Sequence, residues 1–251
     1  MDKIPLPEKL RPKKLSEFVG QEHLVGKDGI IQKLLNNSVT SSFFPSLIFW
    51  GPPGSGKTTL ARIIASNIKS EFFEFSAVNT SSKDIEKVVK NPTFKGGSLQ
   101  GLYSNSPIIF IDEIHRFNKA QQDKLLPYVE RGDIIFIGAT TENPSFEVIA
   151  PLLSRTRVLV LNQHSEKELK LIGKKALKNL KIKIEPKALS FLLSASNGDA
   201  RVLLNVLEIA SNLAGAKPNH LEGELDLHLT ISDIEQALQR RQLTFDKQGE
   251  E

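Results

Sequence analysis

Short runs of apolar residues alternate with amphipathic segments along the first two thirds of the chain. The apolar runs have the length of strands and lie at 46–50, 72–75, 108–112, 134–139 and 157–161. Segments with helical periodicity separate them at 57–68, 81–90 and 118–130. Strands that are apolar throughout and separated by helices are typical of a parallel sheet covered on both faces. The pattern therefore predicts an α/β fold with a parallel five-stranded sheet between helices.

After about residue 163 the strand pattern gives way to helical periodicity. One helix face carries Leu169, Ile172, Ala176 and Leu180, which recur at intervals of three or four residues. Later helical segments are predicted near 187–196, 199–215 and 231–241. We therefore divide the chain into an α/β core at 1–162, a small all-α domain at 163–245 and a tail at 246–251.

The composition is that of a globular protein and excludes several kinds of site. Of the 251 residues, 39% are hydrophobic and 25% are charged, with a formal net charge of only +4. The chain has no cysteine, which excludes disulfides and a thiol nucleophile, and its five histidines are scattered. No apolar run approaches the ~20 residues that span a bilayer, and the N-terminus lacks a signal-peptide pattern. We therefore expect a cytoplasmic protein without a membrane partner.

The sequence GPPGSGKT at 51–58 matches G-x-x-x-x-G-K-[ST] and lies between an apolar strand and a helix. In this context the glycine-rich backbone wraps a phosphate chain, and the helix N-terminus adds partial positive charge. Lys57 suits the outer phosphates, and the hydroxyl of Thr58 suits Mg²⁺. The motif predicts a site for ATP and Mg²⁺ lined by Gly51, Pro52, Pro53, Gly54, Ser55, Gly56, Lys57, Thr58 and Thr59.

Two carboxylates, Asp112 and Glu113, directly follow four apolar residues at 108–111. At the carboxyl end of a parallel strand such side chains face the ligand crevice, so the cost of burying an unpaired charge is avoided. Beside a phosphate-binding loop, Asp112 suits a ligand of Mg²⁺, and Glu113 suits the base that activates water. The alternative interpretation is a strand that simply ends in two solvated acids.

Other polar residues are weaker candidates when taken alone. A side chain near the end of the strand at 134–139 can contact the γ-phosphate and the attacking water, and the choices are Thr140, Thr141 and Asn143. An arginine can stabilise the charge on the transferred phosphoryl group, and the choices are Arg155, Arg157 and Arg201. Each also suits a structural role, because threonines often end strands and arginines often form surface salt bridges.

At this point the sequence resembles a known family. The resemblance lies in GPPGSGKTTLARIIA, IIFIDEIHRFNKAQQDKLLPYVERGDIIFIGATTENPSFEV, LLSR and the opening PLPEKLRPKKLSEFVGQEHLVG. It is to the AAA+ ATPases of the replication-associated recombination protein A family (RarA or MgsA), whose eukaryotic relative is the Werner-helicase-interacting protein. Clamp-loader subunits share a similar opening, and RuvB shares a similar DEIHR and GATT. The run HRFNKAQQD followed by GATTENPSFE favours RarA over both.

The resemblance implies a role for each candidate residue. Residues 51–58 would be the Walker A motif and 108–113 the Walker B motif, and Thr141 would be sensor 1 in preference to Asn143. Arg155 would be the arginine finger that enters the site of the next subunit. Sensor 2, on the helical lid, would be Arg201, and the adenine would lie against Val19 and Gly20.

The resemblance also implies an activity and partners. We expect a DNA-stimulated ATPase that acts on DNA at ends, gaps or stalled forks, near the bacterial nucleoid. Its partners would be the replication machinery and single-stranded-DNA-binding protein. The chain ends about where the family continues into a domain credited with tetramer formation, so we expect it to hold the ATPase core and lid. Three alternatives stay open: a clamp-loader subunit, a branch-migration motor of RuvB type, and a nucleotide-dependent switch that does not hydrolyse ATP.

A local excess of lysine is the strongest indication in the sequence of where DNA would bind. Residues 165–187 contain eight lysines and three glutamates, a local charge of 8 − 3 = +5. Lysine contacts with phosphates give sequence-independent, salt-sensitive binding. A solvated helix face is the alternative. The segment FKGGSLQGLY at 94–103 is either a loop that grips a substrate or an ordinary surface loop.

Overall fold

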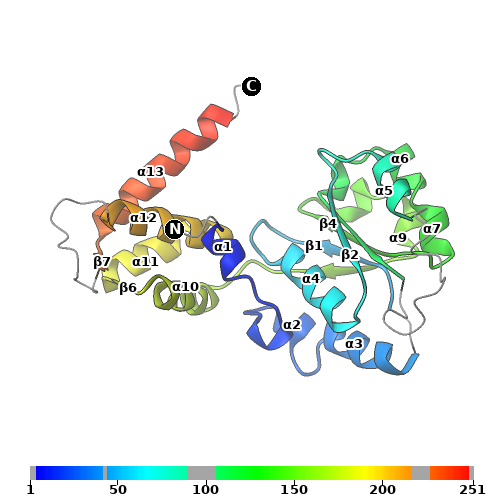
Figure 1. Cartoon of the computed structure of the whole chain (residues 1–251), viewed down its shortest axis with the longest axis horizontal. Coiled ribbons are helices and arrows are strands. Elements are labelled where there is room, and N and C mark those ends of the chain that lie inside the picture. Colours follow the sequence, from blue (N-terminus) through cyan, green and yellow to red (C-terminus); the bar gives the residue numbers. More distant parts are fainter. Residues whose placement is uncertain (1–3, 42–43, 90–105, 216–226, 249–251) are drawn as a thin grey trace. The chain divides into compact units, whose positions relative to one another are not determined.

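The computed structural model describes residues 4–41, 44–89, 106–215 and 227–248, and the chain divides into two compact units. The first, which we call the α/β unit, comprises residues 12–52 and 56–162. The second, the helical unit, comprises the described residues within 1–11, 53–55 and 163–251. Both are shown in Figure 1. The segment 94–103 lies outside the described residues.

A parallel sheet of five strands forms the centre of the α/β unit. Its strands are β1 (Leu47–Trp50), β2 (Phe72–Ser76), β3 (Ile108–Asp112), β4 (Ile135–Thr140) and β5 (Arg157–Val160). They lie in the order β2-β3-β4-β1-β5, and every neighbouring pair is parallel. The predicted five-stranded sheet is therefore confirmed, with each strand within one residue of its predicted ends.

Helices cover both faces of this sheet, which explains why its strands are apolar throughout. Leu47 and Phe49 pack with α3 (Ile30–Ser41) and α4 (Lys57–Asn67) on one face. Ile48 faces the other way and packs in a second cluster, with residues of α5 (Ser82–Val89), α7 (Leu126–Glu130) and α9 (Ala150–Leu153). The bounds of the remaining helices in this unit are α2 (Glu22–Val25), α6 (Lys119–Asp123) and α8 (Pro144–Glu147), with 3₁₀ turns at Leu15–Glu17 and Ile114–Arg116.

The helical unit has its own apolar core. Its helices are α1 (Leu6–Lys9), α10 (Glu166–Leu180), α11 (Pro186–Ala195), α12 (Ala200–Gly215) and α13 (Ile231–Gln248). Leu169 of α10 and Leu203 of α12 are among the buried residues of this core. The structure adds a two-stranded parallel sheet that the all-α prediction lacked, formed by β6 (Ile182–Ile184) and β7 (Leu227–Leu229). Strands of three residues are too short to show a clear alternation in the sequence.

The N-terminal segment belongs to the helical unit, although our division of the sequence placed it in the α/β core. The side chain of Leu6 is buried in the helical core, with 2% of the residue exposed. Its backbone N–H donates to both carboxylate oxygens of Glu208, each at 3.1 Å. No helix among the described residues combines the length and apolar character needed to cross a membrane.

Candidate nucleotide-binding and catalytic site

The loop at 51–58 connects β1 to α4, as its motif predicts. Gly56 has φ +99°, and a Cβ there would lie 2.6 Å from Cζ of Phe18. The left-handed backbone and the close aromatic ring both require glycine at this position. Helix α4 begins at Lys57, so the N–H groups of its first turn lie at the end of the loop. An anion such as a phosphate binds favourably at this kind of helix N-terminus.

The side chain of Lys57 lies within the loop. Its Nζ donates to the carbonyl oxygen of Gly51 at 2.8 Å and to that of Pro52 at 2.9 Å, and only 9% of the residue is exposed. A nearly buried ammonium group needs such hydrogen bonds to offset its lost hydration. The positive charge therefore sits in the loop, on carbonyl oxygens for which phosphate oxygens can substitute.

The two carboxylates stand at the carboxyl end of β3. Asp112 is the last residue of the strand and pairs in register with Ser76 of β2. Its Oδ1 accepts a hydrogen bond from the backbone N–H of Glu113 at 3.1 Å. Glu113 has φ +56°, a conformation uncommon for a residue other than glycine. This left-handed residue ends the strand and turns the chain into the 3₁₀ turn at Ile114–Arg116.

Strand order brings these groups to one edge of the sheet. The end of β1 pairs with the end of β4 through Trp50 and Thr140, and β4 lies next to β3. The backbone N–H of Gly51 donates to the carbonyl oxygen of Thr140 at 3.1 Å. The first residue of the loop is therefore bonded to the strand from which the sensor 1 candidates emerge.

The two adjacent threonines have different environments. Thr140 is 1% exposed, and its hydroxyl is bonded to the backbone of Glu142 and lies 3.0 Å from Nδ1 of His115. Thr141 is exposed. Asn143 is engaged in a structural contact, because its Oδ1 accepts from the N–H of Ser145 and caps α8. Among the three candidates, this arrangement favours Thr141 for contact with a ligand, and its role stays a prediction.

The adenine candidates Val19 and Gly20 lie at the same edge of the sheet. The next residue, Gln21, is 5% exposed. Its Nε2 donates to the carbonyl oxygen of Asn162 at 2.7 Å, and its Oε1 accepts from the N–H of Asn162 at 2.8 Å. Asn162 follows β5, the strand beside β1. The segment is thereby held next to the strand that leads into the loop at 51–58.

The two arginines of LLSRTRV, Arg155 and Arg157, lie in different parts of the α/β unit. Arg157 begins β5 and pairs with Leu47, the first residue of β1, so it stands at the amino edge of the sheet, away from the loop. Arg155 lies beyond α9 and is exposed. Its Nη1 donates to the carbonyl oxygen of Pro151 at 2.8 Å, and its Nη2 lies 2.7 Å from Oε1 of Glu130. Its guanidinium group is thus held at the surface of the α/β unit.

Gln122 is a buried residue that the sequence analysis did not identify. Its side chain donates to the carbonyl oxygens of Phe117 and Glu147, at 3.0 and 2.9 Å, and accepts from the N–H of Ile149 at 3.0 Å. It therefore joins the segment after β3 to the segment that leads to Arg155. The only signal in the sequence is its spacing of three residues from Leu125, which puts it on the buried side of its helix.

In the helical unit, Arg201 lies in the first turn of α12 and is exposed. Oδ1 of Asp199 accepts from the N–H groups of Arg201 and Val202, at 2.7 and 3.0 Å, and so caps this helix. The His164 side chain is only 4% exposed, and its Nδ1 has no hydrogen-bond partner among the described residues. Burial lowers the pKa of His164 below its ordinary 6.5, against the opposing effect of the Glu168 and Asp199 carboxylates.

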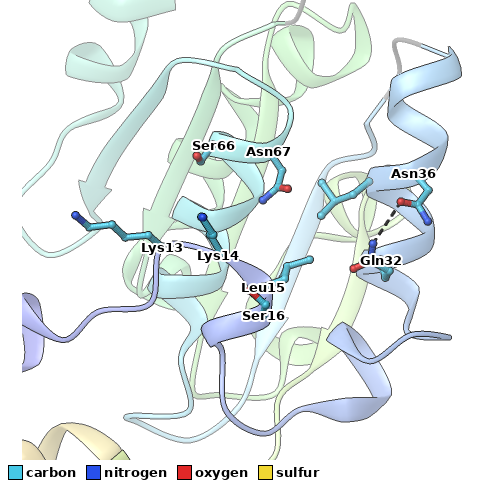
Figure 2. A pocket seen from close by; sticks show the side chains of 9 residues that line it. Lys13, Lys14, Leu15, Ser16, Gln32, Asn36, Ser66 and Asn67 are labelled. Atoms are coloured by element: carbon cyan, nitrogen blue, oxygen red, sulfur yellow. Dashed lines mark hydrogen bonds between the residues drawn. The ribbon is translucent and has the colours of Figure 1, made fainter. Parts of the chain in front are cut away.

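A pocket of about 500 Å³ lies elsewhere in the α/β unit (Figure 2). Its lining is Lys13, Lys14, Leu15, Ser16, Gln32, Leu35, Asn36, Ser66 and Asn67. Ser66 and Asn67 end α4, whereas the glycine-rich part of the loop at 51–58 precedes the first residue of that helix. The pocket is therefore separate from the candidate nucleotide site.

Comparisons with known proteins agree with this architecture. A family model described as the ATPase family associated with various cellular activities (AAA) matches residues 47–163, and one described as the AAA C-terminal domain matches residues 178–251. Among solved structures, the Thermotoga maritima RuvB Holliday junction branch migration motor gives a TM-score of 0.73 at 27% identity, covering 92% of this chain and 72% of that one.

Curated relatives are more similar in sequence. Identity is 40% over 253 residues with replication-associated recombination protein A of Haemophilus influenzae, covering 98% of this chain and 53% of that protein. Identity with the protein of the same name from Coxiella burnetii is 43% over 259 residues, which covers 99% of this chain and 54% of that protein. Identity with ATPase WRNIP1 of Dictyostelium discoideum is 39%, which covers 98% of this chain and 29% of that protein. The chain thus spans about half the length of the bacterial relatives. The resemblance found in the sequence is confirmed: the chain belongs to the AAA+ ATPases and is homologous to replication-associated recombination protein A and to WRNIP1.

Proposed function

We propose that this chain binds ATP with Mg²⁺ and hydrolyses it, as the ATPase part of a protein that acts on DNA at ends, gaps or stalled replication forks. The observation that supports it best is the bond between the Gly51 N–H and the Thr140 carbonyl oxygen. It links the phosphate-binding loop to the strand beside β3, so loop, carboxylates and Thr141 share one sheet edge, where α/β sheets bind ligands.

The residues of this edge fit a nucleotide and its metal ion. Mg²⁺ is usually held by one or two protein oxygens and by substrate phosphates, which suits Thr58 and Asp112. When bound, it would neutralise phosphate charge and orient the phosphate chain. Lys57 would exchange its carbonyl contacts for phosphate oxygens, and the nucleotide would extend along the loop toward Val19 and Gly20.

In the reaction, Glu113 would accept the proton of the attacking water, and Thr141 would hold that water in line with the γ-phosphorus. Arg155 would act on the site of a neighbouring subunit. This is supported by the exposed guanidinium group, whose partners are Pro151, Ser154 and Glu130, none of which belongs to the loop at 51–58. Arg201 would sense the nucleotide from the helical unit. A finger that acts between subunits requires an oligomer, which we expect to be a tetramer.

The names of the relatives support a role in DNA replication and recombination. We place the protein in the bacterial cytoplasm at the nucleoid, with DNA, the replication machinery and single-stranded-DNA-binding protein as partners. The likeness to RuvB favours a branch-migration motor as the second candidate. Movement of a four-way junction by the chain would favour that motor, and capture of a sliding clamp would favour a clamp-loader subunit.

The test is the ATPase rate as a function of protein concentration, with and without duplex DNA that carries ends or gaps. Glu113→Gln serves as the blank for contaminating ATPases. A specific activity that rises with concentration, and rises further with DNA, is the expected result. A rate equal to the blank at every concentration, with ATP still bound, would instead make this chain a nucleotide-dependent switch.

A further inference from the structure

Four lysines lie along one side of α10: Lys167, Lys170, Lys174 and Lys178. At 100° per residue they fall within an arc of about 80°, and at 1.5 Å per residue they span about 17 Å of helix. All four are exposed. We call these four residues the lysine stripe. Lys181, the residue that caps the helix, is exposed as well and extends the positive charge by one more position.

The rest of the helix fixes the lysine stripe in place. The opposite side of α10 is buried in the helical core through Leu169, Gly173 and Ala176. The start of the helix is held by a capping box, in which the hydroxyl of Ser165 and the carboxylate of Glu168 bond each other's backbone N–H. The Glu168 carboxylate is thus used by the cap, 2.6 Å from the backbone nitrogen of Ser165. The helix that carries the stripe is therefore fixed within the helical unit.

Helix stability does not account for this row. Lys170 and Lys174 are four residues apart, as are Lys174 and Lys178, and like charges at that spacing destabilise a helix. Lys167 lies in the first turn, at the positive end of the helix dipole. Among the residues that the structure describes, none forms an ion pair with these four ammonium groups. A row of unneutralised, mutually repelling charges is stabilised when a polyanion binds along it.

The chemistry of the row favours one polyanion, the backbone of duplex DNA. Protein interfaces are depleted in lysine and enriched in aromatic residues and arginine, which the stripe lacks. Sites for single strands stack bases on aromatic side chains, and none lies in this row. Its apolar neighbour is Leu171, which is 54% exposed. Duplex DNA carries one negative charge per about 1.7 Å of its axis, so a row of 17 Å can reach several phosphates.

We propose that the lysine stripe binds the phosphate backbone of duplex DNA without regard to sequence. This inference rests on the proposed function at DNA and assigns it a surface. The test uses Lys170→Gln/Lys174→Gln/Lys178→Gln, because glutamine removes the charge and keeps a good helix former. The matched control removes the same charge from three exposed lysines of the α/β unit, Lys27, Lys33 and Lys119. A third variant replaces the three stripe lysines by arginine and keeps the charge.

The measurement is the affinity for a fluorescently labelled blunt duplex, by anisotropy, over a series of NaCl concentrations. Each phosphate contact adds about 0.9 to the slope of log K against log salt. The stripe variant should therefore lose about 2.7 from that slope, and near 0.1 M salt it should bind at least about tenfold more weakly. The control and arginine variants should keep the slope of the unmodified chain. Circular dichroism melts verify that all variants fold.

Other results would contradict either the lysine stripe as the binding surface or the proposed function at DNA. An equal loss in the stripe and control variants would mean that net charge, and no particular surface, governs binding. An unchanged slope in the stripe variant, while the unmodified chain binds DNA, would refute the lysine stripe and leave the proposed function intact. If the unmodified chain fails to bind duplex DNA even at low salt, the proposed function at DNA fails too. Competition by polyglutamate as strong as that by duplex DNA would assign the surface to an acidic protein instead.

Discussion

Replacing Gln122 by leucine tests how the segment that leads to Arg155 is held. The Gln122 residue is 1% exposed and makes three hydrogen bonds to the backbone of other residues. Leucine has a similar size, but it would leave two carbonyl oxygens and one N–H without partners. At about 1 kcal/mol for each partly buried group, the free energy of unfolding should fall by about 3 kcal/mol.

The assay is urea unfolding followed by tryptophan fluorescence. The chain has one tryptophan, Trp50, and it lies in β1, so the signal reports on the α/β unit that contains Gln122. With an m-value of about 2 kcal/mol/M, the midpoint should fall by roughly 1.5 M while m stays constant.

The matched control is Gln32→Leu in the same unit. Its Nε2 makes one exposed hydrogen bond to Oδ1 of Asn36 at 3.3 Å (Figure 2), so the change should stay within about 0.5 kcal/mol. A loss of less than about 1 kcal/mol for Gln122→Leu would show that water replaces the lost partners. The interpretation of this residue as a structural clamp would then be wrong.

Three more predictions concern the chemistry and the pH dependence. Glu113→Gln should lower ATP turnover by at least about 10²-fold and leave ATP binding intact; an equal loss of binding, measured with a fluorescent ATP analogue, would contradict its role as a base. Arg155→Ala should lower turnover by about 10³-fold. Mixing this variant with Glu113→Gln should restore activity, because a site can then combine Glu113 of one variant with Arg155 of the other. No recovery in the mixture would argue against a finger acting between subunits. Burial lowers the pKa of His164 in the folded state below 6.5, so its contribution to stability is present above pH 6.5 and is lost as the pH falls through the lower folded pKa. His164→Gln should flatten this part of the pH–stability curve in thermal melts, and an unchanged curve would exclude this residue as the source.

The features that could be read from the sequence depend on residues close together in the chain. The five strands were predictable because each is an unbroken apolar run, and helices on both faces of a parallel sheet require that pattern. The loop at 51–58 was predictable because its glycines, Lys57 and Thr58 act within one turn of backbone. Asp112 and Glu113 stood out because they follow such a run directly. Local pattern was therefore sufficient to predict the fold class, and it was sufficient to propose most of the candidate site.

The tertiary structure decided what depends on residues far apart in the sequence. It showed that Thr140 is buried and bonded, which favours Thr141 for the ligand, and that Arg157 begins its strand at the edge away from the loop. It joined Gln21 to Asn162, 141 positions away, and so placed the adenine candidates beside the loop. The clamp made by Gln122 and the ion pair between Arg155 and Glu130 have no sequence signature. Such contacts depend on how elements pack, and neither periodicity nor a motif encodes which distant partner a side chain meets.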